Sequence, residues 1–327
     1  MKLGVMNPVL YTMPLSEALR YLSGLGVQAI EMGSGGYPGK AHFDPAEYLA
    51  SPAKVSELKS LLERYGIEIA AFACHGNAVH PNTDIARRFH NDFADTLKVA
   101  ELFEVDRIVT FSGCPGGCPA ATTPNWVTYT RPAEWAAILD YQWNDVLLPY
   151  WTQAAEMARH HGIDKIALEM HPNHCVYNPE TLLRLRDAIG GTIGANFDPS
   201  HLIWQGIEPT AAIAHLGEQR AIYHFHAKDL RFYEEIRKIN GVLDTKDHAV
   251  LTERSWLFCT VGDGNDYQIW KQMLDALVAV GYDGVISIEH SDALLPPFVG
   301  LERAIAFLKQ ILDSKGMGAD TNYTSTS

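Results

Sequence analysis

Short apolar runs alternate along the chain with longer segments of helical periodicity. Eight of the runs read as β-strands and span residues 2–7, 27–33, 67–73, 106–112, 165–170, 193–198, 222–227 and 285–290. The helical segments cover residues 16–26, 53–66, 83–103, 133–161, 178–190, a stretch after Pro209, 266–281 and 301–312. Eight strands that alternate with eight helices predict a single (β/α)8 TIM barrel, which we expect to occupy residues 1–313.

The last four of these strands each end in a side chain that can bind a metal ion or transfer a proton. They are Glu169 in IALEMHP, Asp198 in IGANFDPSH, His226 in IYHFHAKD and Glu289 in VISIEHSD. Because the reactive groups of such barrels gather at the C-terminal strand ends, we expect the four to lie together. Three carboxylates and one imidazole suit Mn²⁺, Mg²⁺ or Co²⁺ better than structural zinc. The sequence therefore predicts one divalent ion, with Mn²⁺ favoured.

The alternation of side chains along these strands agrees with a barrel that has a polar upper interior. If the four strand-end residues point inward, the residues two positions earlier also point inward: Ala167, Asn196, His224 and Ser287. The residues between them then face the helices: Leu168, Phe197, Phe225 and Ile288. The bulky apolar face is the outer one.

Each strand-end carboxylate also has an ordinary structural explanation. A single Glu or Asp in this position is more often a helix cap or a solvated loop residue, and Asp198 before Pro199 could simply begin a turn. Four coincident placements in the order Glu, Asp, His, Glu favour a metal site over these separate explanations.

Composition excludes several classes of function. The net charge of −13, with 26 basic against 39 acidic residues and no basic run, disfavours a nucleic-acid groove. No apolar stretch approaches the length of a membrane span, and the N-terminal residues read as a first strand and not as a signal peptide, so we expect a cytoplasmic protein. The five cysteines are scattered and odd in number, which favours reduced thiols.

Two long connections and a polar tail interrupt the barrel pattern. Residues 112–135 follow strand four and residues 231–265 follow strand seven, and we expect lids, binding walls or partner surfaces there. Aromatic residues in and near the first connection could form a wall for an aglycone or an attachment surface for another subunit: Trp126, Tyr129, Trp135, Tyr141 and Trp143. The tail 314–327 lacks apolar periodicity and is expected to be disordered.

The strand-end residues, the Asp-x-x-His of Asp198 and His201, and the His-x-His of His224 and His226 resemble those of the xylose-isomerase-like barrels. This family of sugar phosphate isomerases and epimerases includes ketose 3-epimerases, inosose dehydratase and endonuclease IV, and the resemblance runs from residue 1 to about 312. In the ketose 3-epimerases, positions that match the four strand-end residues bind one divalent ion. The resemblance also implies that His201 contacts substrate.

Further polar residues are expected at the same face of the barrel and are candidates for substrate contact: Glu31, His75, His224 and Lys228. Each of these residues could instead have a structural role. His224 could pack inside the barrel or support a ligand, and Lys228 could pair with Asp229. Glu31 and His75 could form hydrogen bonds with the backbone of nearby loops. His171 and His174 are interpreted as loop-packing residues more readily than as extra metal ligands.

The chain departs from the ketose 3-epimerase pattern at two positions. Cys175 stands where those enzymes commonly hold the terminal sugar hydroxyls with Glu, and Phe232 stands where they commonly have Arg, although Arg231 is adjacent. These differences weigh against a free hexulose as substrate. Endonuclease IV uses many more ligands, and the acidic charge of this chain weighs against DNA.

Together these features predict a divalent-metal-dependent isomerase or epimerase of a keto sugar or keto-sugar derivative. A proton next to a metal-polarised carbonyl would be removed to form an enediolate, with Glu169 and Glu289 as the catalytic carboxylates. The alternative is a lyase that uses the same enolisation to expel a β leaving group, as an inosose-type dehydratase or a 3-keto-glycoside deglycosidase would. A binding protein with a vestigial barrel is disfavoured by the complete ligand set.

The length and the first long connection are similar to those of the large subunit of the C-glycoside deglycosidases, enzymes that are built from two different subunits. This similarity implies either a homo-oligomer or a complex with a small second subunit, acting on a small sugar or glycoside.

Overall fold

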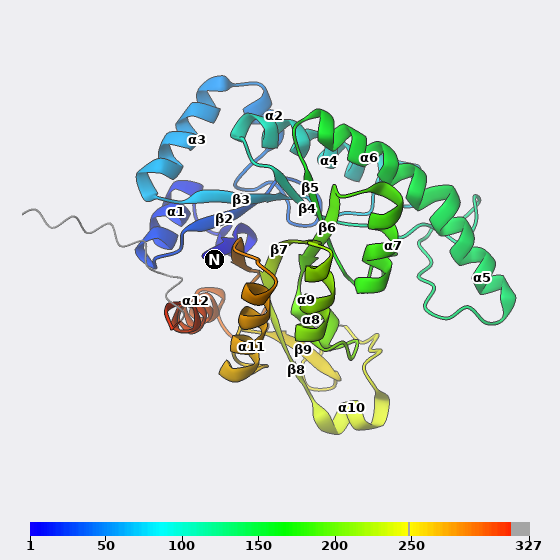
Figure 1. The fold of residues 1–327 in the computed structure, drawn as a ribbon. Helices are drawn as coiled ribbons and strands as arrows, with labels where there is room; N and C mark the ends of the chain where they lie inside the picture. Colours follow the sequence, from blue (N-terminus) through cyan, green and yellow to red (C-terminus); the bar gives the residue numbers. More distant parts are fainter. Residues whose placement is uncertain (248, 315–327) are drawn as a thin grey trace, which may run out of the picture.

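Eight parallel strands close into a barrel in the order β1–β10–β7–β6–β5–β4–β3–β2 (Figure 1). The computed structural model describes residues 1–247 and 249–314. The barrel strands are β1 Lys2–Met6, β2 Ala29–Gly33, β3 Glu68–Ala73, β4 Arg107–Phe111, β5 Lys165–Glu169, β6 Ile193–Phe197, β7 Ile222–Ala227 and β10 Val285–Ile288. The predicted barrel and all eight predicted strands are confirmed.

Helices surround the barrel and cover the outer face of its strands (Figure 1). The longer ones are α1 Leu15–Gly24, α3 Pro52–Tyr65, α4 Thr83–Phe103, α6 Leu148–His160, α7 Pro179–Ile189, α9 Pro209–Glu218, α11 Tyr267–Ala279 and α12 Pro297–Asp313. Shorter segments lie in the connections: the 3-10 turn η1 Asn7–Leu10, α2 Pro45–Leu49, α5 Ala133–Asp140, the π-helical η2 Tyr141–Leu147, α8 Pro199–Ile203 and α10 Glu234–Asn240. Local sequence signals set these boundaries. In α3, for example, the Ser51 side chain accepts a hydrogen bond from the backbone N–H of Lys54, and Gly66 ends the helix with φ of 62°.

The main hydrophobic core lies between the strands and the helices. Phe197 and Phe225 stack there with their ring centroids 5.8 Å apart, and both are fully buried. Inside the barrel, Ala167 belongs to a small cluster of mostly small side chains. The predicted alternation, with the bulky apolar residues facing outward, is confirmed: Leu168, Phe197, Phe225 and Ile288 all belong to the main core. Small inward residues leave room above them for polar groups at the C-terminal strand ends.

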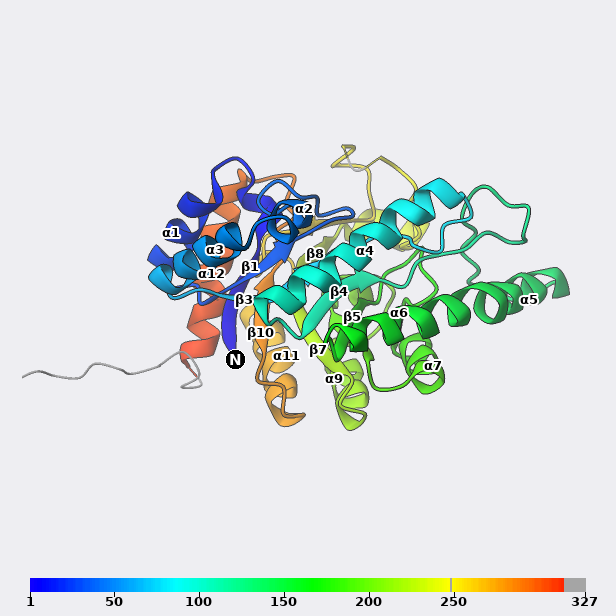
Figure 2. The same ribbon diagram turned by 90° about the horizontal axis from the view of Figure 1, so that it is seen from above.

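The connection after β4 leads into a long helical arm. Segments α5, η2 and α6 follow one another without a break, which confirms the predicted helix over 133–161 (Figure 2). None of the residues of α5 is buried, and this helix extends beyond the barrel. The buried Gln142 side chain donates to the carbonyl oxygen of Pro115 at 3.1 Å and so ties the preceding loop to the arm. Whether this arm binds a second subunit stays a prediction.

The connection after β7 contains more structure than the sequence predicts. Strands β8 Asp229–Phe232 and β9 Trp256–Cys259 pair antiparallel, and α10 lies between them in the chain. Trp256 of this two-stranded sheet stacks on Trp204 with ring centroids 5.0 Å apart, which fixes the sheet above the end of β6. Of the tail expected to be disordered, Ser314 caps α12 and residues 315–327 lie outside the described part of the chain.

Candidate active site

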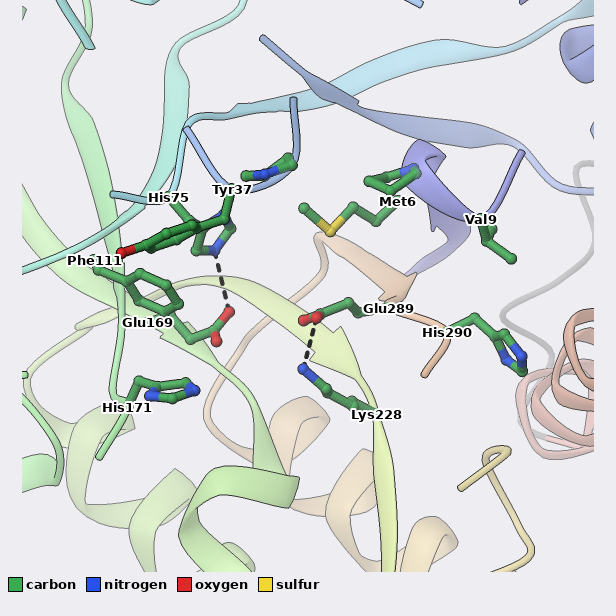
Figure 3. A pocket seen from close by; sticks show the side chains of 12 residues that line it. Met6, Val9, Tyr37, His75, Phe111, Glu169, His171, Lys228, Glu289 and His290 are labelled. Atoms are coloured by element: carbon green, nitrogen blue, oxygen red, sulfur yellow. Dashed lines mark hydrogen bonds and ion pairs between the residues drawn. The ribbon is translucent and has the colours of Figure 1, made fainter. Parts of the chain in front are cut away.

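A cavity of about 300 Å³ opens at the C-terminal ends of the barrel strands. Figure 3 shows Glu169 and His75 on one side of it and Glu289 and Lys228 on another. Its lining residues come from several strand ends and the loops that follow them: Met6, Pro8, Val9, Tyr37, Pro38, His75, Phe111, Glu169, His171, Lys228, Glu289 and His290. About half of the lining side chains are apolar.

The four predicted metal ligands converge beside this cavity. Glu169, Asp198, His226 and Glu289 each offer one donor atom, and all four donor atoms lie within 4.8 Å of one another. Glu169 is the last residue of β5, and Glu289 directly follows β10. Four donors from four strand ends at this separation match the size of a first coordination sphere.

Asp198 provides a direct test of whether a cation fits. One carboxylate oxygen, Oδ1, accepts the backbone N–H of Ser200 at 2.8 Å and caps α8. The other oxygen, Oδ2, is buried and accepts no hydrogen bond. Burial also raises the pKa of Asp198 above its ordinary value, because a charged carboxylate is poorly solvated there. A bound cation would satisfy this oxygen, so the residue acts as a cap and is also suited to be a ligand.

His226 is held on both of its ring nitrogens. Its Nδ1 lies 3.0 Å from Oε2 of Glu169 and 2.9 Å from Oε2 of Glu289, and so faces the cluster. Its Nε2 lies 2.9 Å from Oε2 of Glu31 on the opposite side. The buried Asn196 adds a contact between its Nδ2 and Oε2 of Glu169 at 2.9 Å. The predicted inward position of Asn196 is thereby confirmed.

The two proposed catalytic carboxylates are ionised in this environment. Burial raises the pKa of Glu169. The nearby His201, His226 and His75 side chains lower it by more, so the net pKa lies well below the ordinary value. For Glu289, burial likewise raises the pKa, but the Lys228 ammonium and His226 together outweigh burial and bring the pKa to about 2. Ionised carboxylates are the form that binds a metal ion and accepts a proton.

His201 lies against the ligand cluster, is buried, and is not among the residues that line the cavity. Its Nε2 is 3.1 Å from Oε1 of Glu169 and 3.3 Å from Oδ2 of Asp198. The ring also contacts His171, with centroids 4.0 Å apart, and Phe258 of β9, with centroids 5.5 Å apart. Glu169, His171 and His201 offer a second group of three donor atoms within 4.8 Å of one another. His201 therefore lies close enough to the predicted ion to contact a substrate bound to that ion, or to act as a further ligand.

His75 and Lys228 reach the cavity itself. Nε2 of His75 lies 3.2 Å from Oε2 of Glu169. Nζ of Lys228 lies 2.6 Å from Oε1 of Glu289 and 4.6 Å from the centre of the Phe258 ring. Burial lowers the pKa of Lys228, but the surrounding carboxylates outweigh burial and raise it, so the side chain is an ammonium ion. Both residues are placed where they could contact a bound substrate.

The suggested pairing of Lys228 with Asp229 is wrong. Asp229 turns away from the cavity and accepts the backbone N–H of Gly262 at 2.9 Å and the indole N–H of Trp270 at 3.1 Å. Asn265 donates to the same carboxylate through its side chain at 2.6 Å. Asp229 thus anchors the loop that follows β9 and keeps the two-stranded sheet next to Lys228.

Glu31 and His224 do not occupy the position expected of substrate contacts. Both are fully buried inside the barrel below the ligand cluster, and neither lines the cavity. Nε2 of His224 lies 2.9 Å from Oε2 of Glu31, and the hydroxyl of Ser287 donates to the same oxygen at 2.7 Å. The position of His224 agrees with the alternative that it packs inside the barrel or supports a ligand, because it lies two residues before the strand-end His226. Contact of either side chain with substrate stays a prediction.

The two histidines that follow β5 occupy different positions relative to the cavity. His171 lines the cavity, whereas His174 is buried in the loop and stacks on Phe111 with centroids 4.3 Å apart. None of the aromatic residues of the connection after β4 is among the lining residues in the described part of the chain. Cys175 is buried away from the cavity, and Arg231 donates instead to the backbone carbonyl of Asp263 at 3.3 Å. The cavity thus lacks the usual epimerase contacts at these positions.

The chain belongs to the xylose isomerase-like TIM barrel family, whose model matches residues 19–311. Over 315 residues it is 38% identical to the uncharacterized protein YfiH of Bacillus subtilis (strain 168), and the match covers 95% of this chain and 99% of that protein. The predicted family membership is confirmed. Within the described residues, no helix has both the length and the apolar character needed to cross a membrane.

Two solved structures share the fold at low sequence identity. A D-tagatose 3-epimerase-like protein is 22% identical with a TM-score of 0.63, and the match covers 96% of this chain and 100% of that one. An IOLI protein with a bound zinc atom is 17% identical with a TM-score of 0.66, and the match covers 98% of this chain and 100% of that one.

Proposed function

We propose that this protein is a divalent-metal-dependent isomerase or epimerase that acts on a keto sugar or a keto derivative of a cyclitol or glycoside. The observation that carries the proposal is the convergence of four donor atoms within 4.8 Å of one another beside the cavity. The fold is compatible with it, since the structures of similar shape include a protein described as D-tagatose 3-epimerase-like and one with a bound zinc atom.

In this proposal the three carboxylates and His226 hold one divalent ion. A bound ion would polarise the substrate carbonyl and stabilise the negative charge that develops when the neighbouring C–H loses its proton. The oxygen-rich set with one imidazole favours Mn²⁺, with Mg²⁺ and Co²⁺ as alternatives. The oxygen Oδ2 of Asp198, which lacks a hydrogen bond, supports the fit of a cation to this donor set.

Glu169 and Glu289 are proposed to move the proton. They belong to β5 and to the end of β10, and β6 and β7 lie between these strands in the barrel. The two carboxylates therefore reach a bound substrate from different walls of the cavity. If one removes a proton from carbon and the other, after taking up a proton from solvent, returns it to the opposite face of that carbon, the configuration is inverted, and the first carboxylate then releases its proton to solvent. Both are ionised and can accept a proton.

Substrate positioning is assigned to His75 and Lys228, which line the cavity, and to His201 beside the metal ligands. The lysine is the single Lys or Arg among the lining residues, and it is already paired with Glu289. A substrate that carries a phosphate or carboxylate remote from the metal would find no free cation among these lining residues. We therefore infer an uncharged keto substrate.

Elimination is the second candidate, and the apolar part of the cavity favours it. The apolar and aromatic side chains that line the cavity include Met6, Val9, Tyr37 and Phe111. A free sugar has little apolar surface to place against them, whereas a glycoside presents its aglycone. Expulsion of a leaving group β to the acidified C–H requires the same metal and the same carboxylates, so the two reactions differ only in the fate of the enolate.

Incubation in deuterated water tests the proposal. The Mn²⁺-loaded protein is mixed with ketoses and with 3-keto-glycosides, and mass spectrometry follows deuterium in the sugars together with any released aglycone. We expect solvent deuterium at the carbon next to the carbonyl. Deuterium in an isomer or epimer identifies the first function, and released aglycone identifies elimination. A Glu169→Gln protein is the matched control. If the wild-type protein exchanges no more deuterium than this control in any substrate, the proposal is wrong.

The variant His201→Ala should keep about one metal ion per chain and lose turnover or substrate affinity. The reason is that His201 is assigned to the substrate, although its Nε2 lies 3.1 Å from Oε1 of Glu169. Metal content by elemental analysis is the measurement, with His226→Ala as the variant expected to lose the ion. A metal-free His201→Ala protein would contradict the assignment and make His201 a further ligand.

A further inference from the structure

A closed cluster of polar side chains lies inside the barrel, directly below the proposed metal ligands. Glu31 from β2 contacts His224 and His226 from β7 and Ser287 from β10. All four residues are completely buried, and none of them lines the cavity. Burial of a carboxylate in the centre of a barrel is costly unless it is well hydrogen-bonded. The cluster therefore needs an explanation other than contact with substrate.

The hydrogen bonds of this cluster have a definite direction. Oε2 of Glu31 lies 2.7 Å from the Ser287 hydroxyl and 2.9 Å from Nε2 of both His224 and His226. A carboxylate offers only acceptors, so each of these three neighbours must donate to it. In particular, the hydrogen of His226 must reside on Nε2. When His226 carries a single hydrogen, its lone pair is then on Nδ1.

Nδ1 of His226 is the nitrogen that faces the ligand cluster. It lies 3.0 Å from Oε2 of Glu169 and 2.9 Å from Oε2 of Glu289. Both ring nitrogens therefore face carboxylates and each can carry a hydrogen. When an ion takes the place of the hydrogen on Nδ1, Glu31 keeps the remaining hydrogen on Nε2, so that the lone pair points to the ion, and it also fixes the rotation of the ring. If Glu31 were replaced by a group that donates, the opposite tautomer would be favoured and Nδ1 would carry a hydrogen.

We propose that Glu31 is the positioning residue of the metal centre: it holds His226 as the Nε2–H tautomer and strengthens Nδ1 as a ligand, while His224 and Ser287 keep Glu31 in place. The inference rests on the proposed function, because it requires that His226 bind an ion. It assigns to Glu31 a role in metal affinity and ligand geometry, and none in contact with substrate.

His224 and Ser287 both contact one oxygen of Glu31, whereas His226 contacts both oxygens. His224 approaches Oε2 of Glu31 at 2.9 Å and Ser287 approaches the same oxygen at 2.7 Å. The other oxygen, Oε1, lies 3.0 Å from Nε2 of His226. His226 thus contacts both oxygens, and loss of the Ser287 hydroxyl would leave the contacts of Glu31 to His226 intact. This difference provides a matched control.

The test compares Glu31→Gln with Ser287→Ala in full-length protein that has been stripped of metal. Titration calorimetry measures the affinity for Mn²⁺ and Co²⁺, and the visible absorption of the Co²⁺ form reports ligand geometry. We expect Glu31→Gln to lower the affinity about 10–100-fold and to shift the Co²⁺ spectrum, with about one ion still bound at saturation. Ser287→Ala should change the affinity by only a few fold and leave the spectrum as in the wild type.

Circular dichroism of the metal-free proteins separates a binding effect from a folding effect. If Glu31→Gln does not fold, Glu31→Asp takes its place, because it retains the charge but withdraws it from His226 by one methylene; we expect a smaller loss of affinity and a shifted Co²⁺ spectrum. Wild-type affinity and spectrum in the variant that folds would overturn the role of Glu31 alone. A wild-type protein that binds no ion would overturn the proposed function as well.

Discussion

Replacing any one of Glu169, Asp198, His226 or Glu289 with Ala or Gln is expected to abolish turnover while the barrel stays folded. Each residue supplies one of the four clustered donor atoms, so each substitution removes a ligand of the ion that polarises the carbonyl. Loss of one such electrostatic contribution typically lowers kcat about 10²–10³-fold, and a loss at least this large is expected here. Steady-state kinetics and elemental analysis of the purified variants are the measurements.

The fold should survive these substitutions because the main core lies elsewhere. The large apolar side chains pack between the strands and the helices, whereas the ligands sit at the strand ends. The pKa values of Glu169 and Glu289 lie below their ordinary values, so their neighbours stabilise the ionised forms, and loss of either carboxylate should lower the Tm while the barrel stays folded. Circular dichroism and thermal unfolding should show a folded protein. Glu134→Gln, at an exposed position on α5, serves as the control.

Two or more of the four variants with near wild-type turnover and bound metal would show that the ligand set is wrong. Loss of activity together with unfolding would instead show that the strand-end residues hold the barrel. Neither result is expected, because the strand-end carboxylates contribute no apolar surface to the core.

The barrel and the ligand cluster could be predicted because both depend on local patterns. Alternation along β5, β6, β7 and β10 determines which residues face inward, and the barrel topology places the strand ends at one rim. The positions of Glu169 and Glu289 follow from these two facts. The inward positions of Asn196 and Ser287 follow from the same alternation and are confirmed by their contacts with Glu169 and Glu31.

The depth of Glu31 and His224 along the barrel axis was not predicted from the sequence. Alternation identifies the face of a strand, whereas depth depends on the distance from the strand end, at roughly 3.3 Å per residue. Glu31 lies two residues before Gly33, the last residue of β2, and His224 lies two residues before His226. Both therefore sit about one layer lower than the ligands. This depth could have been read from the spacing of the residues along each strand. The contact between Glu31 and Ser287 could not, because 256 residues separate them in the sequence.

The two-stranded sheet after β7 could not be found by periodicity. Each of its strands has only four residues, and they pair with each other across α10 and a long loop. Alternation over four residues is too short to distinguish a strand from a loop. Consequently Phe258, which lies 4.6 Å from Nζ of Lys228 and contacts His201, was not anticipated as part of the site.

Treatment with a chelator is expected to abolish activity, and Mn²⁺ or Co²⁺ should restore it better than Ca²⁺. Ca²⁺ prefers six to eight oxygen ligands at about 2.3–2.6 Å, whereas four donors within 4.8 Å of one another, one of them the Nδ1 of His226, suit a smaller transition ion. Removing the ion should lower turnover about 10²-fold or more, as for loss of a preorganised electrostatic contact.

Binding can be followed independently of turnover by thermal unfolding. An ion at 100 times its Kd should stabilise the folded protein by about 2.7 kcal/mol if it binds only the native state. Mn²⁺ should therefore raise the Tm of the stripped wild-type protein and leave that of His226→Ala almost unchanged, since Nδ1 of His226 faces both Glu169 and Glu289. Full activity in exhaustively stripped protein would exclude the ion from the reaction. Stabilisation without any gain in turnover would make the ion structural, and the four strand-end residues would then support the rim of the barrel rather than catalysis.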